Sequence, residues 1–154
     1  MLGDAMIVRK SALVAHSAEN MFDLIEAAED YPAFLPWCAG ASILYRDENN
    51  VAAEIKVDFH GVRFQLTTRN PKRRPEYMAI LLERGPFRRF EGEWRLSPLS
   101  PSACKIEFGL QYEFDSPLMG RLAGTVFDRI TNTLVDAFVE RADNVRGPAS
   151  DAGH

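Results

Sequence analysis

The feature that most constrains the fold is a long stretch of period-two alternation. Between residues 41 and 114, apolar and polar residues alternate in six consecutive segments, separated by short turns rich in Gly, Pro, Asn and Ser. Such alternation predicts β-strands with one buried and one solvated face. The sequence therefore predicts an antiparallel meander whose apolar face must be covered by a second layer.

That second layer is predicted at the end of the chain. Ser116 is suited to cap a helix, and Pro117 suits the first turn, where its missing amide proton has no helical partner to lose. From there to about Asn144 the apolar residues indicate an amphipathic helix of about 28 residues, roughly 40 Å long. The predicted buried stripe comprises Leu118, Leu122, Val126, Ile130, Leu134 and Phe138, and it is widened by Met119, Ala123, Phe127 and Ala137.

One strand and two short helices are expected before the meander. Residues 6–15 alternate like a strand, and Ser17 is an N-cap for the first short helix. Pro32 and Pro36 bound a second short helix or turn. This order predicts an α+β fold, in which a curved antiparallel sheet of six to seven strands wraps around the long C-terminal helix.

Composition narrows the class of protein. The chain has 154 residues, 46% of them apolar, and a net charge of −4, which suits one globular domain and gives no overall attraction to nucleic acid. We expect one domain over residues 1–146 and a disordered tail over residues 147–154. No signal peptide or membrane span is recognised, so we expect a cytoplasmic protein, peripheral at the inner membrane at most. Cys38 and Cys104 are expected to be buried free thiols.

Three segments resemble one known family. Residues 31–38 (YPAFLPWC), 83–94 (ERGPFRRFEGEW) and 134–142 (LVDAFVERA) are similar, in this order, to motifs of the coenzyme Q-binding branch of the START-like (polyketide cyclase/dehydrase) superfamily. This branch also includes the bacterial ribosome-association toxin. The resemblance implies the helix-grip fold, with a cavity between sheet and helix. It also implies three alternative functions: binding of a quinone or another isoprenoid in support of respiration, inhibition of ribosomal subunit association, and cyclase chemistry.

We favour non-catalytic binding of a hydrophobic ligand, ubiquinone or a related isoprenoid. Gly120 and Gly124 lie one turn apart in the predicted helix, where each costs about 1 kcal/mol relative to alanine. Small residues are therefore wanted there, either for close packing or for room. An apolar pocket with few polar groups suits a ring on an isoprenoid tail. The residues expected to line it are Phe34, Leu35, Trp37, Phe64, Trp94, Leu122, Val126 and Ile130.

The Pro-bounded segment that contains Trp37 has two interpretations. It either caps one end of the core or forms a lid through which a lipid enters, which would also let it touch a membrane. We favour the lid. Under that interpretation, truncation of Trp37 weakens lipid uptake more than it lowers stability.

A basic segment supports the second hypothesis. Arg69, Lys72, Arg73 and Arg74 fall in or beside a predicted loop over residues 70–75. The simplest interpretation is a solvated loop. The functional interpretation is a patch for anionic lipid headgroups or for ribosomal RNA phosphates, as a ribosome-associated inhibitor would need. No DNA partner is expected, because no nucleic-acid-binding motif is recognised.

No catalytic or metal-binding group is predicted. His16, His60 and His154 lack the spacing to each other, or to cysteines, that a metal site needs, and we expect them on the surface or in turns. No phosphate-binding loop or nucleophile elbow is present. A cyclase can act by shaping its substrate, so a cyclase-like enzyme remains the third alternative. Apart from ubiquinone as a bound ligand, no cofactor is expected.

Overall fold

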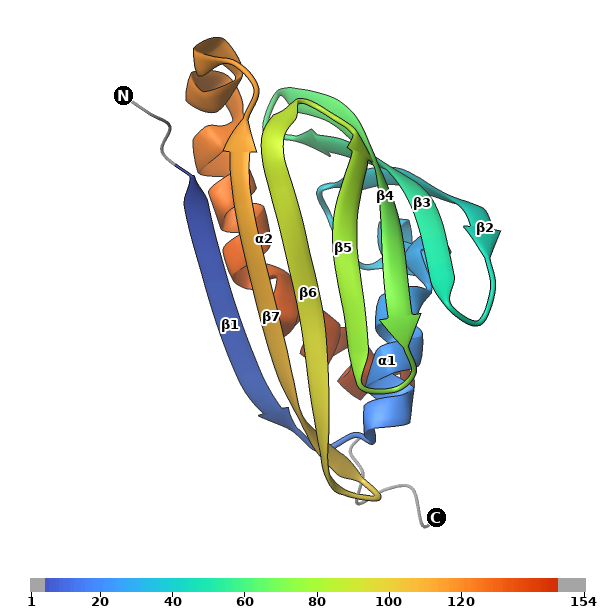
Figure 1. Ribbon diagram of the computed structural model, residues 1–154. Coiled ribbons are helices and arrows are strands. Elements are labelled where there is room, and N and C mark those ends of the chain that lie inside the picture. The colour runs from blue at the N-terminus through green and yellow to red at the C-terminus, as the bar shows by residue number, and fades with distance from the viewer. Residues whose placement is uncertain (1–4, 147–154) are drawn as a thin grey trace.

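The computed structural model describes residues 5–146 of the chain. Seven strands form one antiparallel sheet in the order β1-β7-β6-β5-β4-β3-β2, so that the first strand pairs with the last (Figure 1). The long helix α2 (Pro117–Arg146) crosses one face of this curved sheet. The predicted α+β arrangement is confirmed. The strands are β1 (Met6–Val14), β2 (Cys38–Arg46), β3 (Asn50–Phe59), β4 (Val62–Arg73), β5 (Tyr77–Arg84), β6 (Phe87–Ser100) and β7 (Ala103–Phe114).

Two short helices connect β1 to β2, and their caps follow the sequence. Helix α1 (Ala18–Glu26) begins at Ser17, whose hydroxyl accepts a hydrogen bond of 3.0 Å from the Asn20 amide. The 3-10 helix η1 (Ala28–Ala33) follows and contains Pro32. Helix α2 begins in the same way, because the Ser116 hydroxyl accepts from the Met119 amide at 3.1 Å. Both predicted N-caps are confirmed.

Backbone geometry explains two glycine positions, one in a tight turn and one where two strands approach closely. His60 and Gly61 have φ angles of 50° and 80° and join β3 to β4 in a tight two-residue turn. In β6, a Cβ atom on Gly92 would lie only 2.8 Å from the carbonyl oxygen of Gly109 on β7. Only glycine allows the two strands to approach this closely.

The core lies between the inward face of the sheet and α2. Phe87 packs against Phe114 and Phe127 with ring centroids 4.7 and 5.2 Å away, and Tyr112 lies 4.8 Å from Phe127. Burial of each such side chain contributes about 1.5–3 kcal/mol. This aromatic cluster, from β6, β7 and α2, holds the helix against the sheet near its middle.

The buried stripe of α2 differs from the prediction at its first two leucines. Leu122 is 61% exposed and Leu118 is also exposed. A strict four-residue spacing drifts by about 40° per step around a helix of 3.6 residues per turn, so residues 118 and 138 cannot share one face. The residues that are buried follow the true helical period: Ala123, Phe127, Ile130, Thr131, Val135, Phe138 and Ala142.

Three local predictions are also corrected. Strand β4 continues to Arg73, so the predicted loop over residues 70–75 is wrong for most of its length. Strand β6 continues to Ser100, although the Pro and Ser residues of segment 97–102 indicate a turn. His16 lies in the turn between β1 and α1, one of the two expected places, but it is buried because the last turns of α2 cover this junction. Cys38 and Cys104 are buried and free, as predicted. The predicted tail, residues 147–154, lies outside the described residues.

Candidate ligand-binding cavity

An interior cavity of about 120 Å³ lies between the sheet, the two short helices and α2. Strands β3 to β7 supply one wall, and α1, η1 and the middle of α2 supply the other. Its centre is aromatic: the Trp94 ring lies 4.7 Å from Phe108 and 5.4 Å from Phe138. Such a cavity can hold an apolar group out of water and offers little to a charged one.

Three of the eight predicted lining residues, Trp37, Trp94 and Ile130, line this cavity. The prediction is wrong for Leu122, which lies on the exposed side of α2. The other four pack in or against the core without lining the cavity: Phe34, Leu35, Phe64 and Val126.

One end of the cavity is polar, and it comes from the inward face of β4. Thr68 and Asn70 continue the inward row that begins with apolar residues, and both line the cavity. The Asn70 amide nitrogen lies 3.5 Å from the Met78 sulfur, a weak acceptor. The Asn70 side-chain oxygen is buried and has no hydrogen-bond partner among residues 5–146. Sequence analysis missed Asn70, although period-two alternation continued past Arg69 would have placed it inward.

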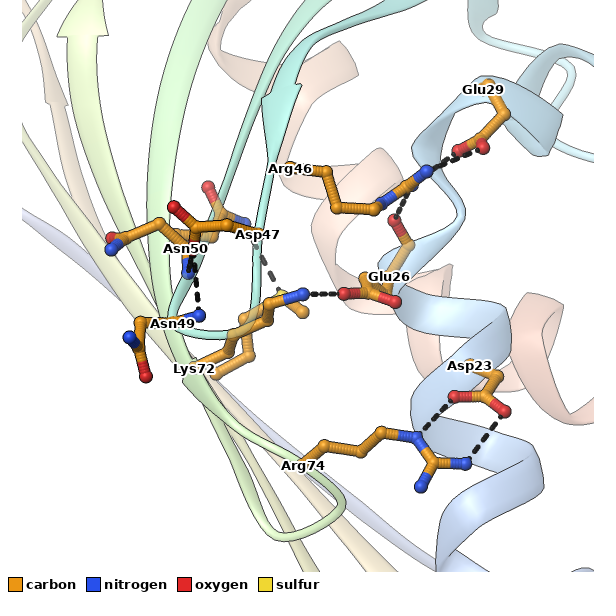
Figure 2. Close-up of polar contacts among 11 residues, drawn as sticks. Asp23, Glu26, Glu29, Arg46, Asp47, Asn49, Asn50, Lys72 and Arg74 are labelled. Carbon is orange, nitrogen blue, oxygen red and sulfur yellow. Dashed lines mark hydrogen bonds and ion pairs between the residues drawn. The ribbon is translucent and has the colours of Figure 1, made fainter.

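Next to this end lies a buried ion pair. The Lys72 ammonium on β4 donates to the Glu26 carboxylate at the end of α1 (Figure 2). Their side chains are only 6% and 18% exposed. Glu26 itself lines the cavity. Loss of either partner would leave a buried charge unpaired, so this contact stabilises the end of α1 over β4.

The four cations of the predicted basic patch do not form one surface. Successive side chains of a strand point to opposite faces, so Lys72 points inward while Arg69 and Arg73 point outward. Arg69 lies 3.6 Å from the Glu83 carboxylate, and the Arg73 guanidinium lies over the Tyr77 ring. Arg74 donates twice to Asp23, at 2.8 and 3.0 Å, as Figure 2 shows. Carboxylates of the same chain therefore offset much of the positive charge.

Burial holds three weakly acidic side chains of the core in their neutral forms. Burial raises the pKa of the Tyr31 phenol, whose hydroxyl donates to the backbone carbonyl of Ile25. Burial also raises the pKa of the Cys104 thiol to about 11, and that of Cys38 in the same direction. A protonated buried thiol is a poor nucleophile. Within residues 5–146, no three His, Cys, Asp or Glu side chains gather as a metal site requires.

A second, open cleft of about 680 Å³ lies beside the first turns of α2, between the helix and strands β1 and β7. Gly120 and Gly124 line it, and a Cβ atom on either would meet nothing within 4 Å. The interpretation of these glycines as close-packing residues is therefore wrong, and they leave room beside the helix.

Among the described residues, neither the length nor the hydropathy of any helix suits a transmembrane span.

Comparison with known proteins agrees with this architecture. The family model described as "Polyketide cyclase / dehydrase and lipid transport" matches residues 14–139. The ribosome association toxin RatA of Vibrio cholerae is 38% identical over 91% of this chain and 97% of that protein. The coenzyme Q-binding protein COQ10 homolog B of Xenopus laevis is 29% identical over 90% of this chain and 58% of that protein.

Among solved structures, the Zhui aromatase/cyclase from Streptomyces sp. R1128 superposes with a TM-score of 0.78. The match covers 93% of this chain and 97% of that chain, at 18% sequence identity. At that identity the likeness establishes the fold, the START-like helix grip, and nothing about chemistry.

Proposed function

The chain belongs to the polyketide cyclase/dehydrase and lipid transport family. We propose that it binds a hydrophobic ligand in its interior cavity without transforming it. The observation that carries the proposal is the composition of the cavity wall: aromatic and aliphatic side chains over most of its length, with one polar end at Thr68 and Asn70. A ligand that is mostly apolar and carries oxygen at one end matches this wall.

We infer that the ligand is an isoprenoid quinone such as ubiquinone. The amide of Asn70 offers a weakly engaged donor and an unpaired acceptor, which suit the oxygens of a quinone or quinol ring. The apolar remainder of the cavity suits the start of an isoprenoid tail. The name of the Xenopus relative, a coenzyme Q-binding protein, supports this class of ligand.

The volume of the cavity implies that it widens on binding. Ligand pockets usually measure about 300–1,000 Å³, whereas this cavity measures about 120 Å³. Trp37 is the half-buried lining residue in the short connection between η1 and β2. Outward rotation of this side chain would enlarge the cavity, which is the lid role that the sequence suggests.

Tryptophan fluorescence tests the proposal directly. The chain has two tryptophans, Trp37 and Trp94, and both line the interior cavity. Titration with decylubiquinone should quench their emission to saturation at one equivalent. Lipid extracted from gently purified protein should contain a quinone in near-stoichiometric amount. A chain that carries no lipid and shows no saturable quenching would exclude the proposed function.

A pair of variants on one strand makes the test specific. Asn70→Leu removes the polar anchor and should weaken decylubiquinone binding about tenfold, the effect of one lost hydrogen bond. Arg69→Leu is the matched control, because the neighbouring side chain points to the outer face of the sheet. Equal affinities in the two variants would argue against a ring at Asn70.

A second candidate function, association with the ribosome, is favoured by the relatives. Several proteins named ribosome association toxin RatA are 35% to 38% identical to this chain. The test is sedimentation of ribosomal subunits on sucrose gradients, with and without the protein, at several salt concentrations. A reduced fraction of joined ribosomes that returns as salt is raised would support this candidate. An unchanged profile at all salt concentrations would exclude it.

A further inference from the structure

The open cleft beside α2 contains a buried polar group without a partner. Tyr112 on β7 lines this cleft and is 1% exposed, and its hydroxyl has no hydrogen-bond partner among residues 5–146. The neighbouring Thr131 hydroxyl donates its proton to the helix carbonyls of Phe127 and Asp128, both at 3.1 Å. An unpartnered buried hydroxyl is costly. A ligand oxygen in the cleft would relieve that cost.

The helix side of the cleft is bare backbone. Gly120 and Gly124 stand one turn apart, and each weakens the helix relative to alanine. A methyl group at either position would meet no atom within 4 Å, so packing within the chain does not require glycine. The space is wide enough for a flat ring to lie against the helix, and side chains at these positions would fill it.

The charged side chains that line the cleft sum to no net charge. Arg88 donates to the Glu113 carboxylate at 3.1 Å, and Arg121 and Asp128 add one charge of each sign. A site with no net charge does not select an ion. Burial raises the pKa of Tyr112 to about 12. The nearby Asp128 carboxylate adds to this shift and the neighbouring Thr131 hydroxyl opposes it, so the Tyr112 hydroxyl remains a proton donor at neutral pH.

We propose that this cleft is a second binding site, which takes an uncharged planar ring bearing a hydroxyl or carbonyl oxygen, with the ring against Gly120 and Gly124 and the oxygen hydrogen-bonded to Tyr112. The ring class includes phenols, quinols and quinones.

The site is separate from the interior cavity. None of the described residues lines both spaces, and the wall between them is aromatic. Phe127 lines the interior cavity and packs edge-on against Tyr112, with ring centroids 4.8 Å apart. The inference therefore does not rest on the proposed function, and each can fail without the other.

The test uses dimethoxy-methyl-hydroquinone, the tail-free head group of ubiquinol, kept reduced and titrated into the full chain. Backbone amide NMR shifts should move at Gly120, Gly124 and Tyr112. Tyr112→Phe should weaken binding about tenfold. The melting temperature of this variant should not fall, because the lost hydroxyl had no partner.

Gly124→Leu should reduce binding at least tenfold by filling the cleft, while its melting temperature stays equal or rises, since leucine is the better helix former. Thr133→Leu is the control, an exposed position on the same helix. Retained affinity in both Tyr112→Phe and Gly124→Leu, or the absence of any shift at saturating probe, overturns the inference. Shifts confined to Trp37 and Trp94 also overturn it and leave the proposed function standing.

Discussion

The imidazole of His16 and the carboxylate of Asp143 join the two ends of the fold. His16 Nε2 lies 2.7 Å from Asp143 Oδ1, although the residues are 127 positions apart in the sequence. His16 is 4% exposed, in the turn between β1 and α1. This contact holds the last turns of α2 against the start of α1, at the end of the sheet opposite the open cleft.

Loss of this contact should lower stability without affecting the cavity. His16→Ala should lower the free energy of unfolding by about 2 kcal/mol, because it removes a hydrogen bond and leaves a buried gap. Asp143→Asn, which keeps an acceptor, should lower it by less than about 1 kcal/mol. Urea denaturation checks both, with Asp136→Asn as an exposed control on the same helix. Equal losses for Asp143→Asn and His16→Ala would show that the pair depends on charge.

The buried pair between Lys72 and Glu26 should matter more than the exposed pair beside it. Lys72→Ala should cost about 3–5 kcal/mol, because the Glu26 charge stays buried without its partner. Arg74→Ala breaks the exposed contact to Asp23 and should cost at most about 1 kcal/mol. Denaturant titrations measure both. The double variant Lys72→Met with Glu26→Leu should recover most of the loss, which would show that the single variant suffers from an unpaired charge.

Two positions of the predicted helical stripe, Leu122 and Phe138, should differ in their contribution to stability. Phe138 is buried against Trp94, and Phe138→Ala should lower the free energy of unfolding by about 3–5 kcal/mol. Leu122 is largely exposed, and Leu122→Ala should change it by less than about 0.5 kcal/mol. Thermal and urea unfolding compare them. A large loss for Leu122→Ala would mean that this leucine is covered in solution.

Stability should fall in mild alkali because of a buried thiol. Burial raises the pKa of Cys104 from its ordinary value of 9.0 to about 11. Above pH 9 the unfolded chain loses this proton while the folded chain keeps it, so the stability present below pH 9 declines as pH rises towards 11. Cys104→Ala should flatten this decline. Tyr112 extends it above pH 10, since its pKa is raised from 10.0 to about 12.

Trp37→Ala tests the lid. This side chain is half-buried over the cavity, so its truncation should change the rate of decylubiquinone uptake and release several-fold, with a smaller effect on melting temperature. Emission of the remaining Trp94 reports both rates. Leu35→Ala, a fully buried neighbour outside the cavity wall, is the control for a purely structural loss. A large drop in melting temperature with unchanged rates would assign Trp37 to the core.

Rules that act on neighbouring residues predicted most of the helices and strands and some residues of the candidate cavity. Ser17 and Ser116 cap helices because a hydroxyl meets free amides wherever a helix begins, whatever surrounds it. The His60–Gly61 turn follows from the two residues themselves. Asn70 was within reach of the same reasoning, since the alternation of β4 simply continues, but its position in a Lys/Arg-rich segment suggested a loop.

Other features depended on contacts between distant segments. Hydrophobic period and helix capping act within a few residues, so the residues alone predict the order of the strands, the amphipathic helix and the apolar face that it covers. Packing in three dimensions sets three other outcomes: Lys72 is paired with Glu26, Leu122 is exposed, and, among residues 5–146, Asn70 and Tyr112 each keep an unpaired polar atom beside a cavity. Those outcomes depend on where α1 and α2 cross the curved sheet, and that crossing is set by packing between residues far apart in the chain.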